Sequence, residues 1–87
     1  MTKIYIYCLF DTLDNFLGVY SSLKAIHRDA IKMCNRGSTS VMMLDAGDYF
    51  TPSLTRLRNT FKGKCDYGIQ YMSDGAMAKI YKTKLKE

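Results

Sequence analysis

Residues 3–22 read KIYIYCLFDTLDNFLGVYSS and contain two short apolar segments separated by a polar loop. Residues 3–10 are apolar at both alternate sets of positions and rich in Ile and Tyr, which predicts a strand buried on both sides. Residues 11–15 have the Asp and Asn content of a turn, and residues 16–20 predict the partner strand. The fold is therefore expected to begin with a β-hairpin.

A helix is predicted immediately after this hairpin. Ser21 and Ser22 provide an N-cap, because serine accepts backbone N–H groups at a helix start. One helical face then carries the apolar residues Leu23, Ile26, Ala30, Met33 and Cys34. Residues 35–37 (NRG) predict its end, with Gly37 in a left-handed conformation.

The remaining sequence predicts a strand over residues 39–44, a loop over 45–48, and a second helix capped by Thr51 with Pro52 at its first position. Leu54, Leu57 and Phe61 form the apolar stripe of that helix, and Gly63 ends it.

Two further strands, over residues 67–72 and 76–85, flank the turn residues 73–75 (SDG). The expected order is β-β-α-β-α-β-β. This is a single small α+β domain over residues 1–87, with one mainly antiparallel sheet and two helices.

Composition excludes several classes of protein. Nearly half of the 87 residues are apolar, which argues against disorder, and no apolar run reaches the length of a membrane span. We therefore expect a soluble protein that acts in the cytoplasm, without contact to a membrane. The three cysteines, Cys8, Cys34 and Cys65, are widely spaced and are expected in the core.

No motif predicts catalysis, a metal site or a cofactor. His27-Arg28-Asp29 matches a kinase tripeptide but falls inside the first predicted helix, in a chain without a glycine-rich phosphate loop. The pairs Asp11/Asp14 and Asp45/Asp48 fit turn chemistry. A magnesium site that gathers both pairs, as in a small metal-dependent nuclease, is a weaker alternative.

The charge of the chain is unevenly distributed. The formal net charge is +5, and residues 1–52 are balanced, so the whole excess lies in residues 53–87. The densest segment is TRLRNTFKGK, residues 55–64. With Leu57 and Phe61 facing the core, Arg56 is expected to point away from it.

The last strand is expected to extend this basic surface. Lys82, Lys84 and Lys86 share one face of the strand with Ile80, whereas Met77, Tyr81 and Leu85 share the other. The predicted contact residues are Arg56, Arg58, Lys62, Lys64, Lys82 and Lys84.

Three interpretations of these cations stay open: a solvated face that guards against aggregation, a site for RNA or DNA phosphates, and a site for an acidic protein. In a nucleic-acid site, Tyr67, Tyr71 or Tyr81 would be available to stack on bases.

Residues 14–25, DNFLGVYSSLKA, resemble a segment near the start of small proteins of tailed phages, and the resemblance extends over residues 1–35. It implies a hairpin that leads into a capped helix. It also implies a host-takeover or anti-defence role, in which a small protein binds and disables a bacterial enzyme in the host cytoplasm. In size and charge the chain is similar to basic, antitoxin-like phage inhibitors of a ribonuclease toxin that bind RNA.

The expected function is therefore that of a small non-enzymatic binding protein that inhibits a host or defence enzyme. The basic C-terminal surface would contact RNA, DNA or an acidic protein partner. The alternatives are a nucleic-acid-binding regulator without a protein target and the metal-dependent nuclease. The chain is expected to be a monomer, or a homodimer formed through an exposed sheet edge.

Overall fold

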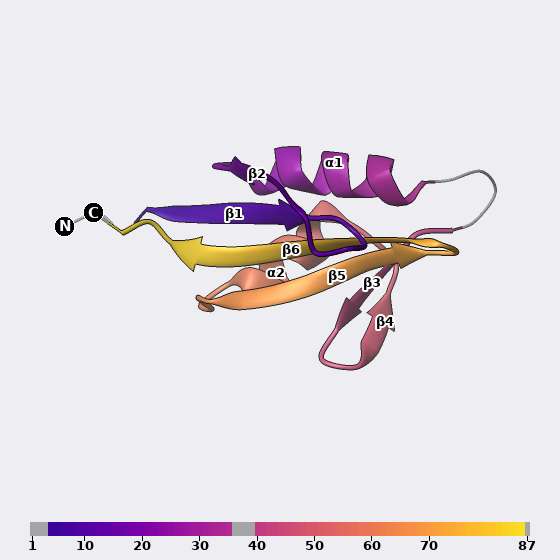
Figure 1. The fold of residues 1–87 in the computed structure, drawn as a ribbon. Coiled ribbons are helices and arrows are strands. Elements are labelled where there is room, and N and C mark those ends of the chain that lie inside the picture. Colours follow the sequence, from indigo (N-terminus) through magenta and orange to yellow (C-terminus); the bar gives the residue numbers. More distant parts are fainter. Residues whose placement is uncertain (1–3, 36–39, 87) are drawn as a thin grey trace.

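The computed structural model describes residues 4–35 and 40–86, and its elements confirm the α+β class (Figure 1). Two helices and one six-stranded antiparallel sheet follow the order β-β-α-β-β-α-β-β. The elements are β1 (Tyr5–Phe10), β2 (Phe16–Tyr20), α1 (Leu23–Cys34), β3 (Met42–Asp45), β4 (Asp48–Phe50), α2 (Leu54–Phe61), β5 (Tyr67–Ser73) and β6 (Ala76–Lys84).

The strands lie in the order β2-β1-β6-β5-β3-β4, so the first and last strands in sequence are neighbours inside the sheet. Leu9 of β1 is opposite Ile80 of β6, and Ile80 is opposite Ile69 of β5. All three side chains are buried. This row of aliphatic residues crosses the centre of the sheet and forms the floor of the core.

Both helices cover the same face of the sheet. Ile26 and Ala30 of α1 and Leu57 and Phe61 of α2 are buried in one cluster with the strand residues of that face. In the view of Figure 1, α1 lies above the sheet and α2 lies behind it. The molecule therefore has two layers, and no helix covers the other face of the sheet in the part of the chain that the structure describes.

The helix starts differ in how well the sequence predicted them. Ser22 caps α1 as expected, because its Oγ accepts the N–H of Ala25. Ser53, and not Thr51, caps α2: its Oγ accepts the N–H of Arg56 at 3.0 Å. Pro52 therefore precedes the cap and does not occupy the first helical position. The expectation for Gly37 lies outside the described residues.

A strand that the sequence did not predict, β4, pairs with β3 in a hairpin. Residues 45–48 were expected to form a loop, but Asp45 and Asp48 are paired and only Ala46 and Gly47 form the turn. Both turn residues have positive φ, 52° and 87°. A type I′ turn requires this geometry, and its backbone twist matches that of the two strands it connects.

No helix among the described residues is long and apolar enough to cross a membrane.

Candidate functional site

The side chains of Arg56, Arg58, Lys62 and Lys64 form an exposed cationic surface along α2 and just beyond its end, which we call the α2 cationic surface. Leu57 and Phe61 face the core from the same helix. The 3.6-residue period of the helix thus directs Arg56 and Arg58 to solvent, as the sequence predicted for Arg56, and Lys62 and Lys64 follow the end of the helix.

Aromatic rings position both ends of this surface. The Arg56 guanidinium carbon lies 4.2 Å from the centre of the Phe50 ring of β4, and the Lys64 Nζ lies 4.2 Å from the centre of the Tyr67 ring. Exposed cation–π contacts contribute about 0.5–1 kcal/mol each. They restrain the two cations without neutralising them, so the charges stay available to an anion.

None of the four cations forms a salt bridge within residues 4–35 and 40–86. Two other cations there do: Arg28 pairs with Asp29 at 3.2 Å, and Lys79 pairs with Asp14 at 2.8 Å. The α2 cationic surface therefore carries positive charge that the rest of the described chain does not neutralise by direct pairing.

Lys82 does not belong to this surface, which corrects the sequence-based expectation. Its side chain is 8% exposed, its Nζ donates to the backbone oxygen of Phe61 at 2.8 Å, and it lies over the Tyr5 ring. Lys82 thus donates to the carbonyl oxygen of the last residue of α2. At this end of a helix a cation also interacts favourably with the helix dipole. The expectation that this helix and the last strand are neighbours is correct, but a buried contact joins them.

Lys84 follows two residues later on the same face of β6 and is exposed. The sequence indicated that Lys82 could be buried, because strand alternation places both lysines on the same face as the core residue Ile80. Lys84 is exposed because it lies at the end of β6, beyond the part of this face that the helices cover.

The three tyrosines proposed for base stacking occupy three different environments. Tyr71 is fully buried and is excluded from surface contact. Tyr67 lies beneath Lys64, and its hydroxyl donates to Asp45. Tyr81 is half-buried on the sheet face that lacks helices, across from Gly68, where an added Cβ would come within 3.2 Å of the Tyr81 ring.

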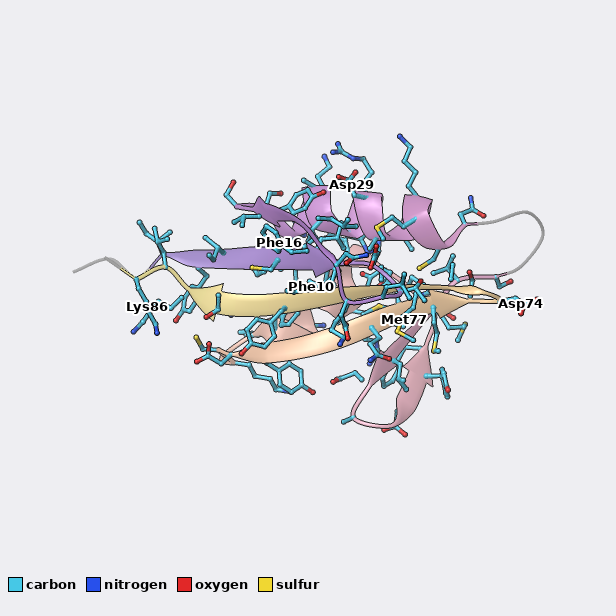
Figure 2. The ribbon with its side chains drawn as sticks, viewed as in Figure 1. Phe10, Phe16, Asp29, Asp74, Met77 and Lys86 are labelled. Carbon is cyan, nitrogen blue, oxygen red and sulfur yellow. The ribbon has the colours of Figure 1, made fainter. Side chains whose placement is uncertain are left out.

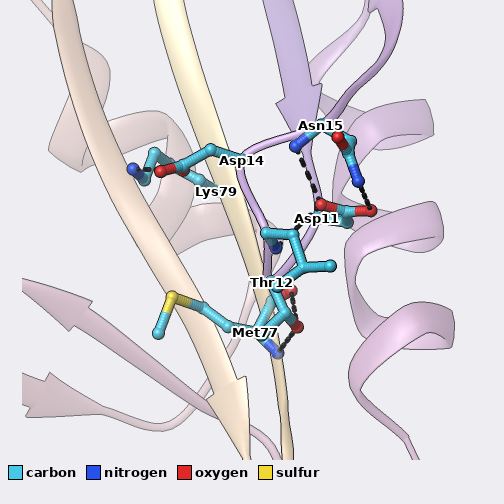
Figure 3. A network of polar contacts seen from close by, with 7 residues as sticks. Asp11, Thr12, Asp14, Asn15, Met77 and Lys79 are labelled. Atoms are coloured by element: carbon cyan, nitrogen blue, oxygen red, sulfur yellow. Dashed lines mark hydrogen bonds and ion pairs between the residues drawn. The ribbon is translucent and has the colours of Figure 1, made fainter.

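Asp11 and Thr12 hold the β1–β2 loop in place. Asp11 Oδ1 accepts the N–H groups of Leu13 and Asn15, both at 2.9 Å, and these bonds lower the pKa of the Asp11 carboxyl, that from Asn15 most (Figure 3). Thr12 Oγ1 accepts the N–H of Met77 and donates to its carbonyl oxygen, which holds this loop on β6.

The two aspartate pairs do not gather around one ion. Asp11 and Asp14 belong to the β1–β2 loop, whereas Asp45 and Asp48 flank the β3–β4 turn, and β6 and β5 lie between these two hairpins. No group of three or more His, Cys, Asp or Glu side chains in the described residues is arranged to hold a metal. The single magnesium site of both pairs that the nuclease alternative assumed is therefore not formed among the described residues.

The His27-Arg28-Asp29 tripeptide forms structural contacts within and around α1. The Asp29 carboxylate accepts the Tyr20 hydroxyl at 2.5 Å, and this bond lowers the pKa of Asp29. His27 Nδ1 lies 2.5 Å from the Tyr71 hydroxyl, and burial lowers the pKa of the His27 imidazole. These bonds tie α1 to β2 and β5.

The cysteines are less buried than predicted. Cys34 is in the core, Cys8 is half-buried, and Cys65 is exposed; none forms a disulfide.

The face of the sheet opposite the helices, which we call the helix-free face, is the feature that the sequence analysis missed. Phe10 and Phe16, from the neighbouring strands β1 and β2, contact each other here with ring centres 5.8 Å apart (Figure 2). By strand register the other apolar residues of this face are Ile6, Cys8, Val19, Met42, Leu44, Tyr49, Met72, Met77 and Tyr81.

Comparison of the chain with protein-family models, with curated proteins and with solved structures finds no match.

Proposed function

We propose that this chain is a non-enzymatic binding protein whose α2 cationic surface contacts the phosphate backbone of RNA or DNA. The observation that carries the proposal is the set of exposed cations on and just after one short helix, without a salt-bridge partner in the described residues. Phosphate contacts need cations at surface spacing, and arginine adds a planar fork that binds two phosphate oxygens.

The biological role that we propose is inhibition of a bacterial host or defence enzyme. The resemblance of residues 14–25 to small tailed-phage proteins supports this class of target. Inhibition of this kind needs no reactive side chain, because a rigid domain bound to the nucleic acid, or in the channel that receives it, blocks access sterically. An enzyme that acts on RNA or DNA is therefore the expected partner.

The test is binding to a mixed-sequence single-stranded RNA and to a DNA duplex at two salt concentrations. Four phosphate contacts predict that affinity falls about 50-fold for a single strand and about 150-fold for a duplex between about 50 and about 200 mM salt. The variant R56A/R58A is expected to bind more weakly and to reduce the slope of log affinity against log salt by about 1.4–1.8.

The matched control is K24A/K32A, which removes two exposed cations from α1 and lowers the net charge by the same amount. This variant is expected to keep nearly all of the wild-type affinity. Equal losses in the two variants would show that net charge alone attracts the nucleic acid. Absence of binding at about 50 mM salt would contradict the proposal outright.

The inhibitory role has a separate test. A bacterial lysate is treated with nuclease to remove nucleic acid, and proteins that bind the immobilised chain are recovered. We expect the wild-type chain and K24A/K32A to retain an enzyme of RNA or DNA metabolism and to inhibit it when purified. Full inhibition by R56A/R58A would separate this role from the α2 cationic surface.

A further inference from the structure

The helix-free face is unusual for an antiparallel sheet with only one covered side. In such sheets the open side normally carries polar residues, which gives each strand a clear apolar–polar alternation. Here β1 presents Tyr5, Tyr7 and Leu9 to the helices and apolar residues to the other side as well. The open side of the sheet is therefore built from residues that normally face a second layer.

The strand positions of this face carry no unpaired charge. Lys79 of β6 is the one charged residue among the described strand positions that point to it, and it pairs with Asp14 at 2.8 Å. Asp66, just before β5, accepts the Thr83 hydroxyl at 2.6 Å near the end of β6. A neutral surface does not attract phosphates, so this face and the α2 cationic surface differ in chemistry. The natural complement of a neutral apolar sheet face is another neutral apolar sheet face, packed about 10 Å away.

We propose that the helix-free face packs against the same face of a second copy of this chain, forming a two-fold symmetric dimer with helices on both outer sides. A two-fold interface requires a surface that complements itself, and a neutral apolar face meets this condition without burying an unpaired charge. Because α2 lies on the opposite side of the sheet, the dimer keeps the excess cations of the two copies apart.

The size of the face agrees with this assignment. With strands about 4.8 Å apart and a rise of about 3.3 Å per residue, six strands of this length cover on the order of 500 Å² on one face. Two such faces bury about 1,000 Å², the size at which specific interfaces begin. A hollow of about 430 Å³ lined by Phe10, Asp14, Lys79 and Tyr81 offers room for a side chain of the second copy.

The test is the molar mass of the chain in solution, measured by sedimentation equilibrium without nucleic acid from about 5 to about 300 µM. The monomer mass is 10.0 kDa, and we expect the mass to approach twice this value as the concentration rises. The variant V19K/Y49K places two charges on the helix-free face at side chains that are 55% and 61% exposed. It is expected to fold normally and to remain a monomer.

The matched control, T55K/N59K, adds the same two charges at exposed positions of α2, on the other side of the sheet, and is expected to dimerise like the wild type. A wild-type mass of 10.0 kDa at every concentration would overturn the proposal. Dimerisation of V19K/Y49K to the wild-type extent would also overturn it, because the interface would then lie elsewhere, for example at a sheet edge. Since no nucleic acid is present, this result and the test of the α2 cationic surface are independent.

Discussion

At the scale of single residues, His27 links stability to pH. Burial lowers the pKa of its imidazole and raises that of the Tyr71 phenol, so the hydrogen bond between Nδ1 and the hydroxyl joins two neutral groups. A histidine whose pKa is lowered by folding binds fewer protons in the folded state than in the unfolded state. Its contribution to stability is therefore complete above the unfolded pKa of about 6.5 and is lost as the pH falls below it.

We accordingly expect the urea midpoint of unfolding to fall between about pH 7.5 and pH 5.5, the interval around the unfolded histidine pKa. The carboxyl groups of Asp11 and Asp29 have lowered pKa values and titrate below this interval. The variant H27Q, which cannot take up a proton, should show a flatter dependence. An unchanged slope in H27Q would assign the pH dependence to another group.

Lys82 gives a second prediction at this scale. The variant K82M keeps an unbranched side chain but removes one of the two donors to the Phe61 carbonyl oxygen, which then keeps only the Lys64 N–H. A hydrogen bond from a charged group contributes about 1.5–3 kcal/mol to stability, so the free energy of unfolding should fall by up to this amount in denaturant titrations. The control K84M alters an exposed lysine and should change stability by less than about 0.5 kcal/mol. Equal losses of unfolding free energy in K82M and K84M would show that the bond from Lys82 to Phe61 does not stabilise the fold.

At the scale of elements, the β3–β4 hairpin contains a residue that is poorly suited to its conformation. Ala46 has a φ of 52°, and the left-handed region costs most residues with a side chain about 1–2 kcal/mol, but costs Asn less. The variant A46N creates the Asn-Gly pair that type I′ turns favour. It should raise the free energy of unfolding by about 0.5–1 kcal/mol. The opposite control is G47A, at φ 87°, which should lower it.

The same alanine explains why β4 was not predicted. Asp45-Ala46-Gly47-Asp48 lacks the Asn-Gly or Asp-Gly signal of a two-residue turn, and a strand of three residues is too short to show alternation. The longer elements were predictable because their periods are clear. The apolar stripes of α1 and α2 and the turn before β6 placed each of these elements correctly, whereas the exact cap of α2 depended on a choice between Thr51 and Ser53.

The candidate site was predictable only in part. Helical periodicity is a local property, and it correctly placed Arg56 and Arg58 in solvent. The burial of Lys82 depends on where α2 ends above the sheet, which is a tertiary relation. Residues 3–10 were expected to be buried on both sides because they are apolar on both. This expectation was wrong for one side, because the two short helices cover only one face of the six-stranded sheet.

At the scale of the whole molecule, the two proposed surfaces should respond to salt in opposite ways. Binding of nucleic acid through the α2 cationic surface weakens as salt screens the charges. Dimerisation through a neutral apolar face buries no net charge, and salt reduces the repulsion between two copies that each carry +5. The dimer dissociation constant should therefore stay the same or fall at about 1 M salt, where the Debye length is about 3 Å. A dimer that dissociates at high salt would indicate an ionic interface.

The central position of β1 and β6 has a consequence for how the chain is made. The first strand pairs along its whole length with the last one, and the Leu85 N–H donates to the Ile4 carbonyl oxygen at 2.8 Å. During synthesis, β1 cannot pair with β6 until residues 76–84 have left the ribosome. Until then β1 can pair only with β2, in a two-stranded hairpin that is marginally stable alone, and pairings between distant segments form slowly. The nascent chain is thus exposed to aggregation and proteolysis until β6 has been made and has paired with β1.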